Sequence, residues 1–414
     1  MPPSSRTDLT FRYEAYRAIA TGIVETASAT FLLMIAVRWF EAGAFAKGCV
    51  AAGSGLGYLL SPGVVSLVQH IRLPAATAAA RLALTGGIAM AAAAAVPILP
   101  VFTVASVISL ATAGALIPLL TQVYQDNYPP ETRGRLFSRT VMIRIVTAAT
   151  FSLGAGRLLS ADISYFRLLL VIFALALVYA SWCLARIPSN PLAAGSGNPF
   201  RMFHAVRDDR VFRATLISWM FMGFANLMML PLRVEYLANP KYGLMLRPDM
   251  IAVLTGVVPN VARLIMSPIW GVLFDRANFF VLRMALNCGF ALGIVSFFTS
   301  DSTLGLMLAA MTFGVSTAGG DVAWSLWVTK IAPPHRVADY MSVHTFFTGL
   351  RGLVAPMVGF ALVERYSMIG MGWVAAGCIL IASLMLLPEA RRGNLVRPLS
   401  PPTSPPVPAD EGET

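Results

Sequence analysis

The sequence contains few charged residues. Of its 414 residues, 12% are charged and 57% are hydrophobic, whereas about 25% of the residues in a soluble domain are charged. Apolar runs long enough to cross a bilayer recur from Tyr16 to Leu387, and a spanning helix needs about 20 such residues. This composition excludes an ordinary soluble enzyme and predicts a helical membrane protein with many spans.

Cysteine and histidine are also scarce. The chain has four of each, and they form neither a Cys-x-x-Cys pair nor a metal-ligand spacing: Cys49, Cys183, Cys288, Cys378, His70, His204, His335 and His344. Disulfide frameworks and zinc sites depend on such patterns. We therefore expect no disulfide, no metal and no cofactor.

Motifs of pumps and membrane enzymes are missing as well. The chain has no Gly-x-x-x-x-Gly-Lys-Ser/Thr loop, the motif that cradles the phosphates of a nucleotide. An aspartyl protease requires two carboxylates that share a proton, and Asp321 is the only aspartate deep in a predicted span. The sequence therefore predicts a protein that is not an enzyme.

The basic residues indicate orientation in the membrane. The net charge is +11, but these residues lie at the ends of apolar runs without forming the patch that nucleic acid requires. Roughly 20 of them fall on the side that holds the termini and about eight on the other. Because basic loops stay inside, we expect both termini in the cytoplasm. We expect a monomer in a bacterial cytoplasmic (inner) membrane, with a small-molecule substrate and no nucleic-acid partner.

The apolar runs divide into two sets of six. The twelve predicted spans lie near 16–39, 48–69, 76–97, 100–124, 138–160, 165–187, 211–233, 250–274, 279–299, 303–329, 339–363 and 367–388. They predict an all-α membrane fold with an N-terminal six-helix bundle (1–187), a cytoplasmic linker with an amphipathic helix (188–210), a C-terminal six-helix bundle (211–388) and a disordered Pro-rich cytoplasmic tail (389–414).

The two sets of spans share landmarks at a nearly constant offset. Three pairs of landmarks are 206, 204 and 201 residues apart, respectively: Ser61-Pro62 with Ser267-Pro268, Pro129-Pro130 with Pro333-Pro334, and Gly22 with Gly223. Transporters are often built from such repeated bundles. Since six spans return the chain to its starting side, the two halves should be related by an axis along the membrane normal.

A short run between the eighth and ninth spans matches a known loop signature. Gly271-Val272-Leu273-Phe274-Asp275-Arg276 contains a Gly-x-Leu-x-Asp-Arg core. With the duplication and the linker, it makes the chain resemble the major facilitator superfamily of secondary transporters, up to about Pro388. The resemblance implies two six-helix bundles with pseudo-twofold symmetry and a cavity lined by the first, second, fourth and fifth helices of each half.

The signature also suggests a gate. Asp275 is expected to accept hydrogen bonds at the start of the fifth span and to pair with a basic residue there, near Arg135, while Gly271 and Arg276 complete the loop. Such a latch would hold one gate shut. The alternative is that Asp275 and Arg276 form only a solvated turn.

Five ionisable residues fall inside predicted spans. They are Glu25, Arg144, Arg263, Asp321 and Arg351, and a charge at mid-membrane costs about 2.5–3.5 kcal/mol on insertion scales. All five lie on helices of the cavity-lining type. Three positive and two negative groups leave a surplus of one positive charge, which predicts an anionic substrate bound by the three arginines. The alternative is that these charges only pair within their own bundles, Glu25 with Arg144 and Asp321 with Arg263 or Arg351.

Other side chains extend this site. Asn226, Asn260 and Trp324 are further candidates for substrate contact, with lipid-interface anchoring as the alternative for the tryptophan. Glu25 and Asp321 are candidates for carrying a coupling proton, because a low-dielectric cavity favours the neutral carboxyl. The sequence thus predicts a secondary active transporter of a small solute, expected to be an organic anion, that works by alternating access. The alternative is a non-transporting receptor or assembly factor that retains the fold.

Overall fold

The computed structural model describes residues 3–191, 203–332 and 337–392, and within them the regular secondary structure is helical apart from one isolated bridge between Pro74 and Pro191. The first half consists of α1 (Pro3–Thr26), η1 (Ala27–Phe31), α2 (Leu32–Arg38), α3 (Ala44–His70), α4 (Ala75–Ala95), α5 (Leu99–Ala115), α6 (Ile117–Asn127), α7 (Pro130–Ala161), η2 (Ile163–Tyr165) and α8 (Phe166–Ala185).

The second half repeats this plan. It consists of α9 (His204–Asp208), α10 (Arg210–Ala238), η4 (Pro240–Tyr242), α11 (Pro248–Ala252), η5 (Val253–Val257), α12 (Val258–Arg276), α13 (Phe279–Phe298), α14 (Thr303–Ile331), α15 (Val337–Val363) and α16 (Met368–Arg391). Twelve stretches among the described residues are long and apolar enough to cross a membrane. The predicted all-α fold with twelve spans is confirmed.

The first helix begins earlier than the hydropathy predicts, at Pro3 rather than near residue 16. Its polar residues are held by contacts with the end of α6. Arg6 Nε donates to Asn127 Oδ1 at 2.7 Å, and Thr7 Oγ1 donates to the Asn127 carbonyl at 2.8 Å. Arg17 pairs with Glu14 at 2.7 Å. Because these groups satisfy one another, a polar segment continues the apolar helix.

The linker and the tail lie partly outside the described residues, which omit 192–202 and 393–414. Within the predicted amphipathic segment the structure describes Phe203 and the short helix α9. The Phe203 ring packs on Phe346 and Phe347 of α15, with centroids 5.3 and 6.0 Å away. This ring therefore contacts the C-terminal helices.

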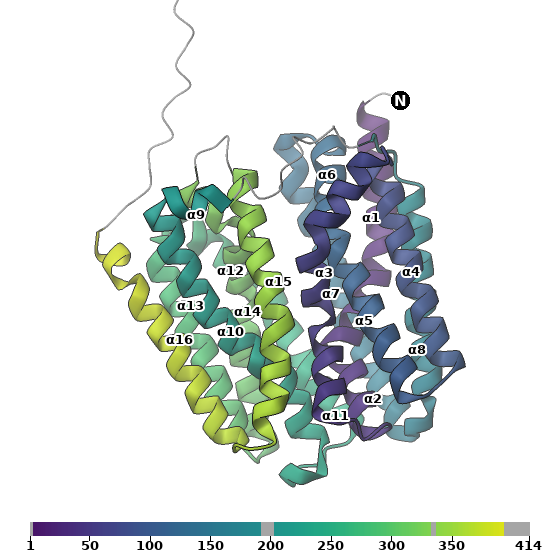
Figure 1. Cartoon of the computed structure of the whole chain (residues 1–414), viewed down its shortest axis with the longest axis vertical. Coiled ribbons are helices and arrows are strands. Elements are labelled where there is room, and N and C mark those ends of the chain that lie inside the picture. Colours follow the sequence, from purple (N-terminus) through teal and green to yellow (C-terminus); the bar gives the residue numbers. More distant parts are fainter. Residues whose placement is uncertain (1–2, 192–202, 333–336, 393–414) are drawn as a thin grey trace, which may run out of the picture.

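The two halves lie side by side, and α3 and α15 run along their junction (Figure 1). Small residues allow these two helices to touch. A Cβ added to Gly55 would lie 2.2 Å from the Gly352 carbonyl carbon, and one added to Gly349 would lie 2.5 Å from the Leu59 nitrogen. Close backbone approach of this kind is typical of helix pairs in membranes.

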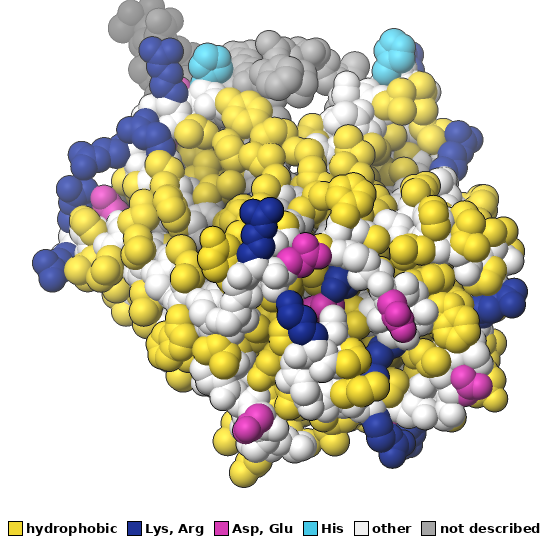
Figure 2. Space-filling model, turned by 60° about the horizontal axis from the view of Figure 1, so that its bottom comes forward, with side chains coloured by type: hydrophobic (Ala, Val, Ile, Leu, Met, Phe, Trp, Pro, Cys, Tyr) yellow, Lys and Arg dark blue, Asp and Glu magenta, His cyan; other side chains and the backbone are white. Residues whose placement is uncertain are grey.

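Contacts between the halves concentrate away from the N-terminus. We call the end that carries the N-terminus and α9 the terminal end, and the opposite one the far end (Figure 1). At the far end Lys47 Nζ donates to Glu235 Oε1 at 2.6 Å, Arg38 Nη2 donates to the Leu246 carbonyl at 2.7 Å, and the Asp249 amide donates to Ser160 Oγ at 2.8 Å. Figure 2 shows charged side chains of both signs among the apolar ones on this side of the molecule. The far end is therefore closed.

The glycine junction gives a first prediction. Replacing Gly55 by alanine places a methyl group against the Gly352 backbone, so α3 and α15 must separate. Overpacking of this kind costs about 1–3 kcal/mol, and we expect a lower Tm for Gly55→Ala in detergent. Gly63→Ala is the matched control on the same helix, because its added Cβ meets nothing within 4 Å. Equal Tm values for the two variants would contradict this packing.

Candidate functional site

The site lies where two spans lose regular α-helical geometry. In the first span the π-helical turn η1 follows Thr26, and in the eighth span the π-helical turn η5 precedes Val258. The two turns meet across the halves, with the Oγ1 atoms of Thr30 and Thr255 2.7 Å apart. Such π-bulges are frequent at functional sites. Here they bring the cavity-lining residues of both halves together.

A cavity of about 110 Å³ opens beside these turns. Residues of both halves line it: Glu25, Thr26, Ala29, Ala148 and Ser152 from the first, and Arg233, Thr255, Gly256, Pro259, Asn260, Arg263, Phe313 and Thr317 from the second. Most of these side chains are polar, although they lie in the middle of apolar helices. The lining suits a small polar or charged solute.

Four of the five predicted mid-membrane charges form one chain of ion pairs. Arg144 Nε lies 3.1 Å from Glu25 Oε2, Arg263 Nη1 lies 3.0 Å from Glu25 Oε1, and Arg263 Nη2 lies 2.8 Å from Asp321 Oδ2. The pairing within each half was expected as an alternative, and the pair between Arg263 and Glu25 joins the halves. The order Arg144, Glu25, Arg263, Asp321 alternates in charge, so the chain is neutral.

Local packing brings the chain of ion pairs together. A Cβ added to Gly22 would lie 2.6 Å from the Arg144 carbonyl oxygen, so glycine one turn before Glu25 allows α7 to approach α1. Arg263 also donates from Nη1 to Asn260 Oδ1 at 2.9 Å.

The Asp321 side chain is 52% exposed. Because the far end is closed, we infer that the water that reaches Asp321 enters from the terminal end.

Arg233 is a cavity residue that the sequence analysis missed. It lies near the end of the predicted seventh span, where it was counted among the orientation signals, but α10 continues to Ala238 and carries it into the cavity wall. Its guanidinium carbon lies 3.9 Å from the centroid of Phe313, and its side chain forms no ion pair with a described residue. Its Nη1 atom is buried without a hydrogen-bond partner. This cation is available to a ligand.

Arg351, a predicted substrate ligand, is not among the described residues that line the cavity. It is 4% exposed inside the C-terminal bundle, and its Nη1 donates to the Trp219 carbonyl at 2.6 Å. The physical reason is Gly223 on α10, where a Cβ would lie only 2.5 Å from Arg351 Cζ. The missing side chain lets the guanidinium turn toward α10 and away from the other half.

The remaining predicted residues have different positions. Asn260 lines the cavity. Asn226 and Trp324 are partly buried and are not among its lining residues. The Trp324 ring packs on His344, with centroids 5.6 Å apart, which places it in the C-terminal bundle. The roles of Asn226 and Trp324 in substrate contact stay predictions.

The predicted gate is only partly described. Of its four residues, Asp275 and Arg135 have side chains outside the described set. Arg276 is exposed and ends α12, and a Cβ added to Gly271 meets nothing within 4 Å. The latch between Asp275 and the fifth span therefore stays a prediction.

The ion pair of Lys47 with Glu235 is a closure that the sequence analysis did not identify. Both side chains are at most 10% exposed, and Asn239 Nδ2 donates to the same Glu235 oxygen at 2.7 Å. The two residues come from opposite halves, and the sequence places each at the end of an apolar run, as an orientation charge would be. Their burial shows that the helices α3 and α10 carry them into the far-end junction.

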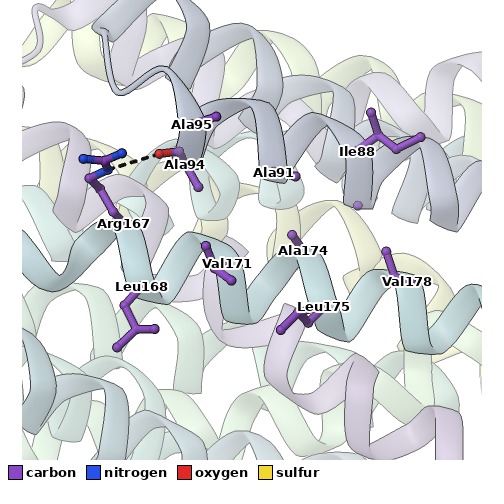
Figure 3. Close-up of a pocket in the computed structure, with 11 residues that line it drawn as sticks. Ile88, Ala91, Ala94, Ala95, Arg167, Leu168, Val171, Ala174, Leu175 and Val178 are labelled. Atoms are coloured by element: carbon purple, nitrogen blue, oxygen red, sulfur yellow. Dashed lines mark hydrogen bonds between the residues drawn. The ribbon is translucent and has the colours of Figure 1, made fainter.

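A larger hollow of about 510 Å³ lies between α4 and α8 (Figure 3). Its described lining is apolar except for Arg167, whose Nε donates to the Ala94 carbonyl at 3.1 Å. Ile88 and Leu175 at this surface are 61% and 63% exposed. Apolar exposure on membrane-spanning helices fits contact with lipid chains. We assign no solute to this groove.

The closure predicts a conformational effect of one substitution. Lys47→Met leaves the Glu235 carboxylate buried without its cation, a change that costs about 3–5 kcal/mol in proteins, and it should shift the protein toward opening at the far end. The measurement is the labelling rate of Ser152→Cys in the cavity by a membrane-impermeant thiol reagent added on the far side, in a background without the four native cysteines. Lys47→Met should raise this rate above that of the parent.

The matched control removes both charges. Lys47→Met combined with Glu235→Leu leaves no buried charge, so labelling from the far side should return toward the rate of the parent. Labelling of the single variant at the parent rate would show that the pair does not hold the far end closed.

Comparison with known proteins agrees with this architecture. The model of the Major Facilitator Superfamily matches residues 72–356. A mutant of the nucleoside transporter NupG superposes with a TM-score of 0.75 at 14% identity, covering 92% of this chain and 99% of that one. A D-xylose–proton symporter superposes with a TM-score of 0.65 at 15% identity, covering 92% of this chain and 95% of that one. The human organic anion transporter MFSD10 superposes with a TM-score of 0.64 at 13% identity, covering 93% of this chain and 100% of that one.

No curated protein matches the chain in sequence. At these low identities the structural neighbours show the fold alone. The family model covers more than half of the chain, and the twelve spans and two halves have the corresponding architecture. The chain is a member of the major facilitator superfamily and an integral membrane protein.

Proposed function

We propose that this protein is a secondary active transporter that moves a small organic anion by alternating access between its two bundles. The observation that carries the proposal is Arg233 in the cavity wall, which forms no ion pair with a described residue and whose Nη1 is buried without a hydrogen-bond partner. The ion-pair chain beside it is neutral, so Arg233 leaves the site with one positive charge. A guanidinium binds a carboxylate or phosphate through two parallel hydrogen bonds.

Other groups in the cavity complement such a ligand. Ser152 Oγ lines the cavity and has no hydrogen-bond partner among the described residues. The Thr26 and Thr317 hydroxyls also line the cavity but donate to the Ile23 and Phe313 carbonyls, while the Phe313 ring offers an apolar face under Arg233. A solute with one anionic group and a small body would pair with Arg233 and accept a hydrogen bond from Ser152. The predicted positive surplus is thus supplied by Arg233 in place of Arg351.

The ion pairs that join the halves supply a route for coupling. Glu25 is shared between Arg144 of its own half and Arg263 of the other half. Separation of the halves would leave Glu25 with one cation fewer, and loss of a cationic neighbour favours proton uptake by a carboxylate. Asp321 is the second candidate, since it is paired with the same Arg263. Proton coupling through these two carboxylates is therefore part of the proposal.

The conformation fits one step of such a cycle. With both termini on the cytoplasmic side of a bacterial inner membrane, the closed far end faces outward and the cavity communicates with the cytoplasm. Nucleoside, sugar and organic anion transporters share this fold, so the fold itself does not select a substrate. Selection of an anion rests on the cavity charges.

Arg233→Gln tests the substrate class. The purified protein is screened by thermal unfolding with monocarboxylates, dicarboxylates, phosphate esters, sugars and nucleosides, because a ligand that binds the folded state raises Tm. We expect organic anions to raise the Tm of the parent and Arg233→Gln to lose at least tenfold in affinity, about 1.4 kcal/mol. Arg247→Gln is the matched control, since its side chain is 76% exposed.

Two results would overturn the assignment. One is stabilisation by sugars or nucleosides without any anion effect. The other is an anion effect that Arg233→Gln retains in full. Flux of the stabilising anion into proteoliposomes then distinguishes a transporter from a receptor, which binds the same anion without moving it.

Glu25→Gln tests the coupling. Without a titratable group at this position, a pH gradient should no longer drive accumulation of the stabilising anion in proteoliposomes, whereas exchange of labelled for unlabelled anion at equal pH should continue. Glu41→Gln, at an exposed far-end position, should keep gradient-driven accumulation. Unchanged accumulation by Glu25→Gln would remove this carboxylate from the coupling route.

A further inference from the structure

Five side chains form a buried cationic cluster inside the C-terminal bundle, apart from the transport cavity. They come from four helices and are 0–4% exposed: Trp219 on α10, Arg283 on α13, Trp327 on α14, and His344 and Arg351 on α15. The guanidinium carbons of Arg283 and Arg351 lie 3.6 and 5.7 Å from the centroid of the Trp219 ring. The His344 ring lies 5.1 Å from the Trp219 ring.

The two arginines have no carboxylate partner among the described residues. Arg283 contacts the Trp219 ring and Met222 Sδ, which accepts from Nη2 at 3.2 Å. A thioether is a weak acceptor. Arg351 donates to the Trp219 carbonyl and to Thr348 Oγ1 at 3.0 Å, both neutral acceptors. Two buried positive charges without an anion are costly in the interior of a membrane-spanning bundle.

The cluster also holds donors that lack acceptors. Arg283 Nη1, Arg351 Nε, Trp219 Nε1 and Trp327 Nε1 are buried without a hydrogen-bond partner, as are both ring nitrogens of His344. Guanidinium and indole N–H groups donate only. What the cluster lacks is therefore an acceptor, and its two positive charges require that acceptor to be negative.

We propose that this cluster binds a small inorganic anion of the size and charge of chloride. The five side chains are 0–4% exposed, and such an enclosed set of donors suits a monatomic anion better than an organic one. A monatomic anion accepts N–H groups from several directions, as donors on four helices would offer them. The site would join α10, α13, α14 and α15 and so stabilise the C-terminal bundle.

Chloride binding is measured on the full purified chain. Thermal unfolding is followed while sodium chloride replaces sodium gluconate at constant ionic strength, and we expect a saturable rise in Tm of about 3 °C or more. Because Trp219 and Trp327 are part of the cluster, bromide or iodide should also quench tryptophan fluorescence with a saturable component. A Tm that does not depend on chloride, or quenching without saturation, would overturn the proposal.

Variants locate the effect. Arg283→Met should abolish the chloride-dependent rise, and Trp327→Phe, which removes one donor and keeps the ring packing, should weaken chloride at least threefold even if Arg283→Met fails to fold. Arg233→Gln, in the transport cavity, should retain the full rise. Retention of the rise in the folded cluster variants, or its loss in Arg233→Gln alone, would place the anion elsewhere and overturn the proposal.

Discussion

The structure depends on Arg263, which holds a carboxylate of each half at once. It contacts Glu25 of the first bundle at 3.0 Å and Asp321 of the second at 2.8 Å. A lone guanidinium at mid-membrane would be expensive, so its two partners permit it to stay there and also keep the halves in register. The π-helical turns η1 and η5 lie on the spans that carry Glu25 and Arg263, and the pair of Thr30 with Thr255 adds a second contact between the halves.

The sequence was sufficient for the fold, and it also singles out the four mid-membrane charges that the structure joins in ion pairs. Spans are readable because every backbone group must be satisfied within a helix in lipid, and Glu25, Arg144, Arg263 and Asp321 stand out because they interrupt apolar runs. The pair between Arg263 and Glu25, which joins the halves, was not predictable. Sequence periodicity shows which face of a helix a residue lies on but does not show which helix packs against that face. The π-helical turns shift that face further by inserting an extra residue in each span.

The positions of Arg233 and Arg351 differ from what the sequence pattern suggests, for different reasons. Arg233 resembles an orientation charge because it directly follows the apolar run 227–232, yet α10 continues for another turn and buries it. Arg351 follows the cavity pattern of its helix, but the glycine at 223 opens a place for it on α10. A glycine opposite a long cationic side chain is a signal that sequence shows only once the helix pairing is known.

The strength of the far-end closure also limits how the protein can work. A transporter must populate both conformations, so the contacts that close one end cannot exceed those that close the other by more than a few kcal/mol. A buried ion pair meets this condition because its desolvation offsets most of its attraction. Lys47 and Glu235 therefore specify a closed geometry while contributing little net stability. Once the halves begin to part, water solvates both charges and the remaining barrier falls.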